Sequence, residues 1–297
     1  MALPRAAALA LVCLAVGLAG CGGVSPGAPP ESGAGTTATP APVPTDRATL
    51  PPGVGEGGVH DGATLAAAHT DRVLDADSYT LSRNETTYWP NGTVGWRTNA
   101  TVERNATTRR WRYRERSPVP KPTTGRSPAV VGRDIWGEGE RAYLRERHAD
   151  GTDRVRRLGG ETFGSLRLFG LRLDANFVAL FGGLEIRLAG RETVDGTTHY
   201  RLAGSDVTDS DRMDRAVPGW NVTDVSFEAV VAADGAIRRY RVAYTAVRPD
   251  AGRVRTVSVV RYDRVSSTTP RRPGWVPTDA NASGSARLTL RPPSRSR

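Results

Sequence analysis

Apolar and polar residues alternate along most of the chain between residues 78 and 265, and this period of two predicts β-strands. The first alternating stretch covers residues 78–116, where Tyr79, Leu81 and Trp111 stand between polar neighbours. Because successive side chains of a strand point to opposite faces, each strand is expected to bury one face and to expose the other.

Residue pairs that are typical of hairpin turns separate these stretches. They are Asn91-Gly92, Asp150-Gly151, Asp195-Gly196 and Asp234-Gly235, and a last alternating stretch, 253–265, follows Ala251-Gly252. Such pairs favour two-residue turns in which both residues adopt positive φ. The chain is therefore predicted to form one large antiparallel meander.

A period of three and four residues, which is typical of an amphipathic helix, begins after Asp61. Asp61 is a suitable N-cap for a helix over residues 62–75. One stripe of that helix carries Leu65, His69, Val73 and Ala76. We interpret His69 as a packed histidine that makes one local hydrogen bond.

The most apolar part of the chain after the first 20 residues is 159–184. Its apolar residues cover most of the circumference of a helix, and such a helix is buried or lies over an apolar site. Two interpretations stay open: the segment completes the core against the concave face of the sheet, or it lines a cavity for an acyl chain. The cavity-lining candidates are Leu166, Phe169, Leu173, Phe177, Leu180 and Phe181. The predicted fold is α+β, with one N-terminal helix and this apolar segment packed on a large curved antiparallel sheet, a half-barrel-like meander.

The first 20 residues have the pattern of a lipoprotein signal peptide. Arg5 precedes an uncharged run over residues 6–20, which is shorter than the roughly 20 residues that a membrane-spanning helix needs. Leu18–Cys21 resembles a lipobox, in which a peptidase cuts before a cysteine that carries a lipid. We therefore predict cleavage between Gly20 and Cys21 and lipid attachment at Cys21. A short membrane-anchor helix is the alternative.

Composition divides the remainder of the chain into three parts. Residues 21–52 are rich in Pro, Thr and Gly and lack aromatic residues, so we expect a disordered stalk after the lipidated cysteine. Residues 53–267 form the predicted α+β domain. Residues 268–297 form a tail rich in Pro, Arg and Ser, with a short edge strand at 287–290. Cys13 leaves with the signal peptide, so the mature chain is expected to have no internal disulfide.

The chain is basic, with 41 Lys and Arg against 31 Asp and Glu and a net charge of +10. Cations are densest between residues 104 and 126, where Arg110, Arg112, Arg114 and Arg116 alternate along one strand. We interpret these arginines as the exposed face of that strand, and attraction to anionic lipid headgroups is the second interpretation. No nucleic-acid partner is expected, because the chain is exported and tethered.

Six Asn-x-Ser/Thr triplets occur, at Asn84, Asn91, Asn99, Asn105, Asn221 and Asn281. In an exported chain they are candidate glycosylation sites. Asn91 is expected at a hairpin tip, whereas Asn99 and Asn105 lie in strand-like stretches and would need to face solvent.

The sequence contains no evident pattern of catalytic or metal-ligating residues. His60, His69, His148 and His199 lack the spacing of metal ligands on one element, and phosphate-loop and nucleophile motifs are absent. The acidic stretch 206–214 lacks the central glycine and closing glutamate of a calcium loop, so we interpret it as a solvated loop. No enzyme activity, cofactor or metal is expected, although dispersed residues of a hydrolase stay an alternative.

The N-terminal part of the chain resembles a family of haloarchaeal surface lipoproteins of unknown function. The resemblance rests on Leu18–Cys21, on Pro51–Val54, on His69 in its helix and on Ser78–Thr80 in the following strand. It implies an archaeal surface protein, and a GC-rich actinobacterial host is the alternative. The plan of a helix on a large curved sheet is also similar to the LolA/LppX half-barrels, which implies a lipid held in an apolar concavity.

These observations predict a membrane-anchored extracytoplasmic lipoprotein without enzyme activity that binds a lipid or another hydrophobic molecule in a half-barrel cavity. The alternative is a structural or cell-surface interaction protein without a ligand cavity. The expected partners are the cell membrane, through the lipid on Cys21, and either a hydrophobic ligand or anionic lipid headgroups. The oligomeric state is left open.

Overall fold

The computed structural model describes residues 49–74, 76–121, 128–159, 173–194, 196–249 and 251–278. Three helices are present in this part of the chain: α1 (Gly62–Leu74), α2 (Leu173–Gly183) and α3 (Ser210–Ala216). Two short strands, β1 (Val54–Gly55) and β2 (Gly58–Val59), pair with each other before α1. Each of the described helices is too short to cross a membrane.

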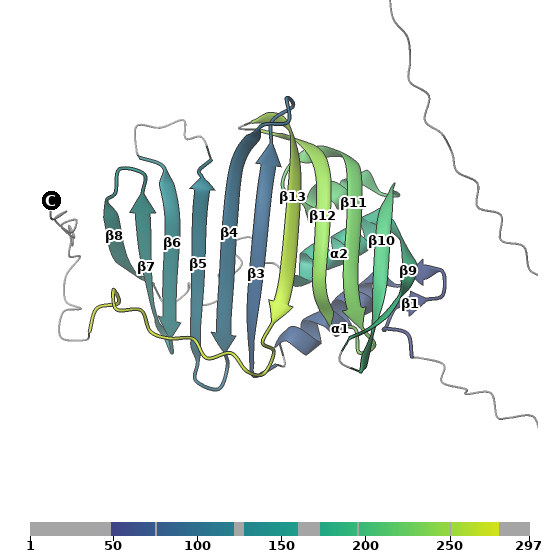
Figure 1. The fold of residues 1–297 in the computed structure, drawn as a ribbon, viewed down its shortest axis with the longest axis horizontal. Coiled ribbons are helices and arrows are strands. Elements are labelled where there is room, and N and C mark those ends of the chain that lie inside the picture. The colour runs from purple at the N-terminus through teal and green to yellow at the C-terminus, as the bar shows by residue number, and fades with distance from the viewer. Residues whose placement is uncertain are drawn as a thin grey trace, which may run out of the picture. The chain divides into compact units, whose positions relative to one another are not determined.

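Eleven long strands form one antiparallel sheet, which confirms the predicted fold class (Figure 1). The first run is β3 (Ser78–Tyr88), β4 (Val94–Asn105), β5 (Arg110–Val119), β6 (Val130–Glu138), β7 (Arg141–His148) and β8 (Asp153–Leu158). The second run is β9 (Leu184–Val194), β10 (Thr197–Val207), β11 (Trp220–Ala232), β12 (Ile237–Arg248) and β13 (Gly252–Asp263). Within each run, consecutive strands are neighbours.

The two runs meet where β3 pairs with β13, in the interior of the sheet. Their register extends from Thr80 opposite Asp263 to Tyr88 opposite Arg255. The first and last long strands of the chain are therefore hydrogen-bonded neighbours, and β8 and β9 are the two edges. This pairing joins two meanders into one sheet, a detail that the pattern of hairpin turns does not predict.

Three of the predicted hairpins have the expected turn glycine. Gly151, Gly196 and Gly235 have φ of +83°, +74° and +88°. Only the turn at Asp195-Gly196 joins its strands through two residues, as predicted. The other three turns are longer, because four residues separate β7 from β8 and β11 from β12, and five separate β3 from β4. In these three pairs only the glycine adopts positive φ, with Gly92 at +82°. The first residue of each pair accepts a hydrogen bond from the N–H two residues later, as Asn91 does from Thr93.

The predicted N-cap of α1 is confirmed. Asp61 Oδ1 accepts a hydrogen bond from Thr64 N–H at 3.0 Å, and Asp61 Oδ2 accepts one from the Thr64 hydroxyl at 2.7 Å. These bonds satisfy one of the N–H groups that a helix leaves unpaired at its start. Of the predicted stripe, Leu65, His69 and Val73 are buried on α1, whereas Ala76 lies after the helix ends at Leu74 and is half-buried.

The interpretation of residues 206–214 as a solvated loop is wrong, because part of this stretch forms α3. Asp209 is its N-cap and accepts a hydrogen bond from Arg212 N–H at 3.0 Å. Met213 is fully buried and belongs to the main apolar core. One capping carboxylate and the buried side chains of Met213 and Ala216 therefore stabilise a seven-residue helix in a stretch of mainly polar sequence.

The helices pack on one face of the second run of strands, and we call this side of the sheet the inner face. Figure 1 shows α1 and α2 behind β12, β11 and β10. Phe177 and Leu180 of α2 and Leu65 of α1 join Phe227 and Leu202 of the sheet in the largest core cluster. A second cluster lies on the inner face of β3–β8 and β13.

Residues 266–278 pack against the opposite, outer face, although the sequence assigns residues from 268 onward to a tail. Thr268 N–H donates to the Ser78 hydroxyl at 2.9 Å. Trp275 Nε1 donates to Asp134 Oδ2 at 2.8 Å, and Val276 packs with Trp136. The yellow segment in Figure 1 follows this path from β13 across the first run of strands. The predicted edge strand at 287–290 lies outside the described residues.

Candidate functional site on the inner face of the sheet

A row of apolar side chains crosses the inner face of the first run of strands. The register places these residues opposite one another in the order Leu81, Val102, Tyr113, Ile135 and Leu144, on β3 to β7. All five are buried. Among the described residues outside the strands, Val73 at the end of α1 and Val265 after β13 pack in this cluster. The described helices therefore cover little of this half of the sheet.

Trp111, two residues before Tyr113 on β5, begins a second row of inner-face side chains beside the apolar row. It lies directly opposite Gly137 on β6. A Cβ atom at Gly137 would lie 2.0 Å from Trp111 Nε1, so the indole ring lies flat over the glycine. Ala142 and Leu158 continue this second row on β7 and β8. The absence of a side chain at Gly137 gives the inner face room for the ring.

Three of the cavity-lining candidates, Phe177, Leu180 and Phe181, are buried on α2 over the second run of strands. The rings of Phe177 and Phe181 stack with their centroids 5.3 Å apart. Phe177 also meets Tyr240 edge-on at 5.1 Å, and Phe181 meets Phe227 at 5.9 Å. These contacts fill the space between α2 and the sheet. Leu173 is the first residue of α2, and Leu166 and Phe169 lie outside the described residues.

His69 lies fully buried where the two apolar clusters meet. Its ring centroid is 5.0 Å from that of Phe177 and 4.7 Å from that of Tyr262. Its Nδ1 accepts a hydrogen bond from Ile237 N–H at 3.1 Å. The prediction of a local hydrogen bond is therefore wrong, because the partner is 168 residues away. The fold, and not the helix, supplies the donor.

Two polar atoms at this junction have no hydrogen-bond partner among the described residues. They are His69 Nε2 and the hydroxyl of Tyr262. Burial lowers the pKa of His69 to about 4 and raises that of Tyr262 well above its usual value. Because Nδ1 accepts the backbone hydrogen, we assign the proton of the neutral imidazole to Nε2. Unpartnered buried donors of this kind are costly and mark places where a ligand or water acceptor would be stabilised.

A row of charged residues lies beside the apolar row on the same face. Arg83 pairs with Glu85, and Arg133 pairs with Glu115 at 3.1 Å and Glu146 at 3.4 Å. The hydroxyl of Tyr113 donates to Glu115, and burial is the main reason why the pKa of Tyr113 is raised. The inner face therefore offers apolar and ionic groups side by side.

Sequence reasoning missed this charged row, although its signal is present. On β3, the positions that face inward continue from Tyr79 and Leu81 to Arg83 and Glu85. Two charged residues thus take positions where the alternation predicts apolar ones. Charged residues at the inward-facing positions of a strand indicate a polar site on the buried side of a sheet.

The predicted glycosylation sites differ in accessibility. Asn84, Asn91, Asn99 and Asn221 are exposed. Asn105 is half-buried, with its Oδ1 bonded to Thr108 N–H and its Nδ2 bonded to Thr268 O. Asn281 lies outside the described residues, as do Gly20 and Cys21 at the predicted cleavage site.

Of the arginines predicted to form the exposed face of one strand, Arg110, Arg114 and Arg116 are exposed on the outer face of β5, whereas Arg112 is half-buried. Trp111 and Tyr113, which alternate with them, are buried. Arg110, Arg112 and Arg114 pair with Glu138, Asp134 and Glu103 of neighbouring strands. Among the described residues, no group of three or more His, Cys, Asp or Glu side chains could hold a metal ion.

Several solved structures are similar to this chain. The lipoprotein LppX of Mycobacterium tuberculosis matches with a TM-score of 0.39 and 10% identity, over 70% of this chain and 97% of that one. LprF of Mycobacterium bovis matches with a TM-score of 0.39 and 12% identity, over 74% and 99%. A LolA superfamily protein of Nitrosomonas europaea matches with a TM-score of 0.25 and 12% identity, over 71% and 94%.

A search of curated proteins finds no match. A family model does match, over residues 5–279, which include most of the predicted signal segment and the whole described sheet. The chain therefore belongs to the family of unknown function DUF7537.

Proposed function

We propose that the chain is a non-enzymatic lipoprotein of the extracytoplasmic face, anchored through Cys21, that binds a lipid or another hydrophobic molecule on the inner face of its sheet. The observation that carries the proposal is the apolar row from Leu81 to Leu144, beside which the described helices contribute Val73 alone. All five side chains of this row are buried, and an acyl chain that packs against them would gain about 25 cal/mol per Å² of apolar surface removed from water.

The polar groups beside this row suit an amphiphile better than a pure hydrocarbon. An acyl chain would contact Ile135 and its neighbours, while a head with hydrogen-bond acceptors would reach the charged row at Arg133 or the unpartnered His69 Nε2. Ligand sites of this type are mainly apolar with a few polar groups that fix orientation.

Anchorage is the second part of the proposal and rests on the sequence of residues 1–21. A diacylated cysteine would hold the chain firmly, since each buried methylene contributes about 0.8 kcal/mol. The stretch 22–52 would then separate the sheet from the bilayer surface.

Native mass spectrometry of the exported chain carrying Cys21→Ser, purified without detergent, tests the binding proposal. We expect a bound hydrophobic mass that organic extraction removes. Leu144→Ala in the apolar row should lower the retained fraction severalfold. Leu202→Ala, an equally buried leucine in the other cluster, should leave it unchanged. Both substitutions should lower the free energy of unfolding by about 2–5 kcal/mol, so they are matched for general damage.

Two results would contradict the binding proposal. One is a chain that carries no hydrophobic mass and takes none from vesicles. The other is an equal loss in both leucine variants, which would indicate loosened packing in place of a site. Either result would favour the alternative of a structural or cell-surface interaction protein.

A further inference from the structure

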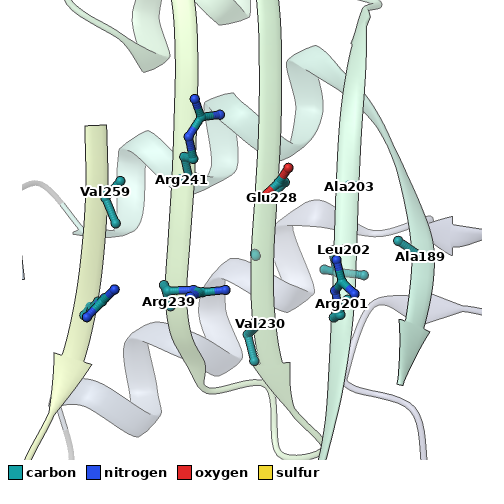
Figure 2. A pocket seen from close by; sticks show the side chains of 11 residues that line it. Ala189, Arg201, Leu202, Ala203, Glu228, Val230, Arg239, Arg241 and Val259 are labelled. Carbon is teal, nitrogen blue, oxygen red and sulfur yellow. The ribbon is translucent and has the colours of Figure 1, made fainter. Parts of the chain in front are cut away.

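Four arginines surround a hollow on the outer face of the second run of strands, far from the proposed lipid site. Arg201 lies on β10, and Arg239 and Arg241 lie on β12 (Figure 2). Arg261 lies on β13. The hollow has a volume of about 300 Å³. That volume is at the lower end of the range for small-molecule sites.

Strand register explains how distant parts of the sequence build this hollow. Arg201 lies opposite Val230, Val230 lies opposite Arg239, and Arg239 lies opposite Arg261. The next row on the same face contains Ala203, Glu228, Arg241 and Val259. Figure 2 shows Arg239 and Arg201 on one level with Val230 between them. The short alanine and valine side chains form the floor, and the long arginines form the wall.

The charges of these arginines are not compensated by carboxylates. The side chains of Arg201, Arg239 and Arg261 make no hydrogen bond or ion pair in the part of the chain that the structure describes. Arg241 donates to the Ser226 hydroxyl at 3.3 Å. Glu228 lies opposite Arg241 but makes no ion pair with it. Four guanidinium groups and one carboxylate leave three positive charges in excess around the hollow.

The arrangement costs free energy unless an anion binds. Like charges directly opposite each other on neighbouring strands, as at Arg239 and Arg261, are destabilising. The outer face of β5 avoids this cost, because Arg110, Arg112 and Arg114 each pair with a carboxylate of a neighbouring strand. The two arginine-rich faces of one sheet thus differ in whether the protein itself supplies the counter-charge.

We propose that Arg201, Arg239, Arg241 and Arg261 form a binding site for a phosphate-bearing group. The planar guanidinium fork matches phosphate oxygens in bidentate fashion, and several forks around one hollow are a common way of holding phosphate. The floor of Ala203, Val230 and Val259 accommodates an apolar part of the same molecule. The site lies on the face opposite the proposed lipid site, so it stands independently of that proposal.

The same chemistry could come from free phosphate or from a phospholipid headgroup, and two probes distinguish these sources. The full exported chain carrying Cys21→Ser would be titrated with inorganic phosphate in a calorimeter. In parallel it would be sedimented with vesicles of phosphatidylglycerol in phosphatidylcholine, with pure phosphatidylcholine vesicles as the control. Binding of either probe that depends on the pocket supports the site and identifies its source.

The decisive variant is Arg239→Gln with Arg261→Gln, and its matched control is Arg253→Gln with Arg255→Gln. All four arginines are exposed, and the control pair lies on β13 outside the hollow. Both double variants lose the same charge, and circular dichroism checks that each is folded. We expect the pocket variant to lose at least about tenfold in affinity, since charged hydrogen bonds are removed, and the control to lose less than about twofold. Equal losses in the two variants, or no binding of either probe by the native chain, would overturn the proposal.

Discussion

Acidification should destabilise the fold through His69. The imidazole is fully buried in α1, between the rings of Phe177 and Tyr262. Its Nδ1 accepts the hydrogen of Ile237 N–H at 3.1 Å. Protonation of Nδ1 would place a positive charge among apolar rings. It would also turn Nδ1 into a donor that faces the donor Ile237 N–H, so the hydrogen bond to β12 would be lost.

The size of the effect follows from the pKa of this residue. Burial lowers the pKa of His69 from 6.5 to about 4. Between these two values the unfolded chain binds more protons than the folded chain, so stability falls as the pH falls. The contribution is fully present above pH 6.5 and is lost progressively toward pH 4. At 1.36 kcal/mol for each unit of pKa, the loss amounts to about 3 kcal/mol by pH 4.

Urea unfolding of the Cys21→Ser chain between about pH 7.5 and pH 4, compared with the same chain carrying His69→Asn, measures this loss. The asparagine Oδ1 can accept from Ile237 N–H, but it does not titrate. The loss of ring contacts in the variant is the same at every pH, and the carboxylates titrate in both chains. Neither effect therefore changes the difference between the two chains as the pH falls. The gap in unfolding free energy between native and variant should therefore narrow by about 3 kcal/mol as the pH falls. His60→Asn, which removes an exposed histidine, should follow the native chain throughout. A gap that stays constant with pH would refute the reasoning.

Three further predictions concern packing, capping and anchorage. Gly137→Ala should lower the free energy of unfolding by about 1–3 kcal/mol, because the new Cβ would lie 2.0 Å from Trp111 Nε1. Gly132→Ala on the same strand, with a nearest atom at 3.4 Å, should cost less than about 0.5 kcal/mol, and equal costs in urea would count against the Trp111 packing. Asp209→Ala should cost about 1 kcal/mol and lower the melting temperature by roughly 2–4 °C; an unchanged melt would mean that the cap of α3 contributes nothing. Cys21→Ser should release the chain into the medium or leave it uncut, and membrane fractionation that finds it processed and still bound would place the anchor elsewhere.

The elements that could be predicted from the sequence are those whose cause is local. A carboxylate such as Asp150 or Asp234 accepts a hydrogen bond from the N–H two residues later. The glycine that follows each of them adopts positive φ, so a pair of adjacent residues is enough to predict the turn. The N-cap at Asp61 is local in the same sense.

The pairing of β3 with β13 has no such local cause. Arg83 and Val260 are paired although most of the described chain lies between them in sequence. The alternation of apolar and polar residues is equally compatible with β3 or β13 at an edge of the sheet. The helix α3 was missed for a related reason. Its stability depends on Met213, which is buried against α2 and β11, and not on the acidic residues around it.

The two arginine-rich faces show why charge density along a chain is a poor guide to a charged site. The densest block of cations in sequence includes β5, where antiparallel neighbours bring Asp134 opposite Arg114 and within reach of Arg112. Those carboxylates come from a different part of the sequence and neutralise the arginines. β12 and β13 are also rich in arginine, yet there the register brings Arg239 beside Arg261 with no carboxylate partner. The quantity that predicts an anion site is therefore the charge that remains after strand pairing. That quantity exists only once the register of the sheet is known.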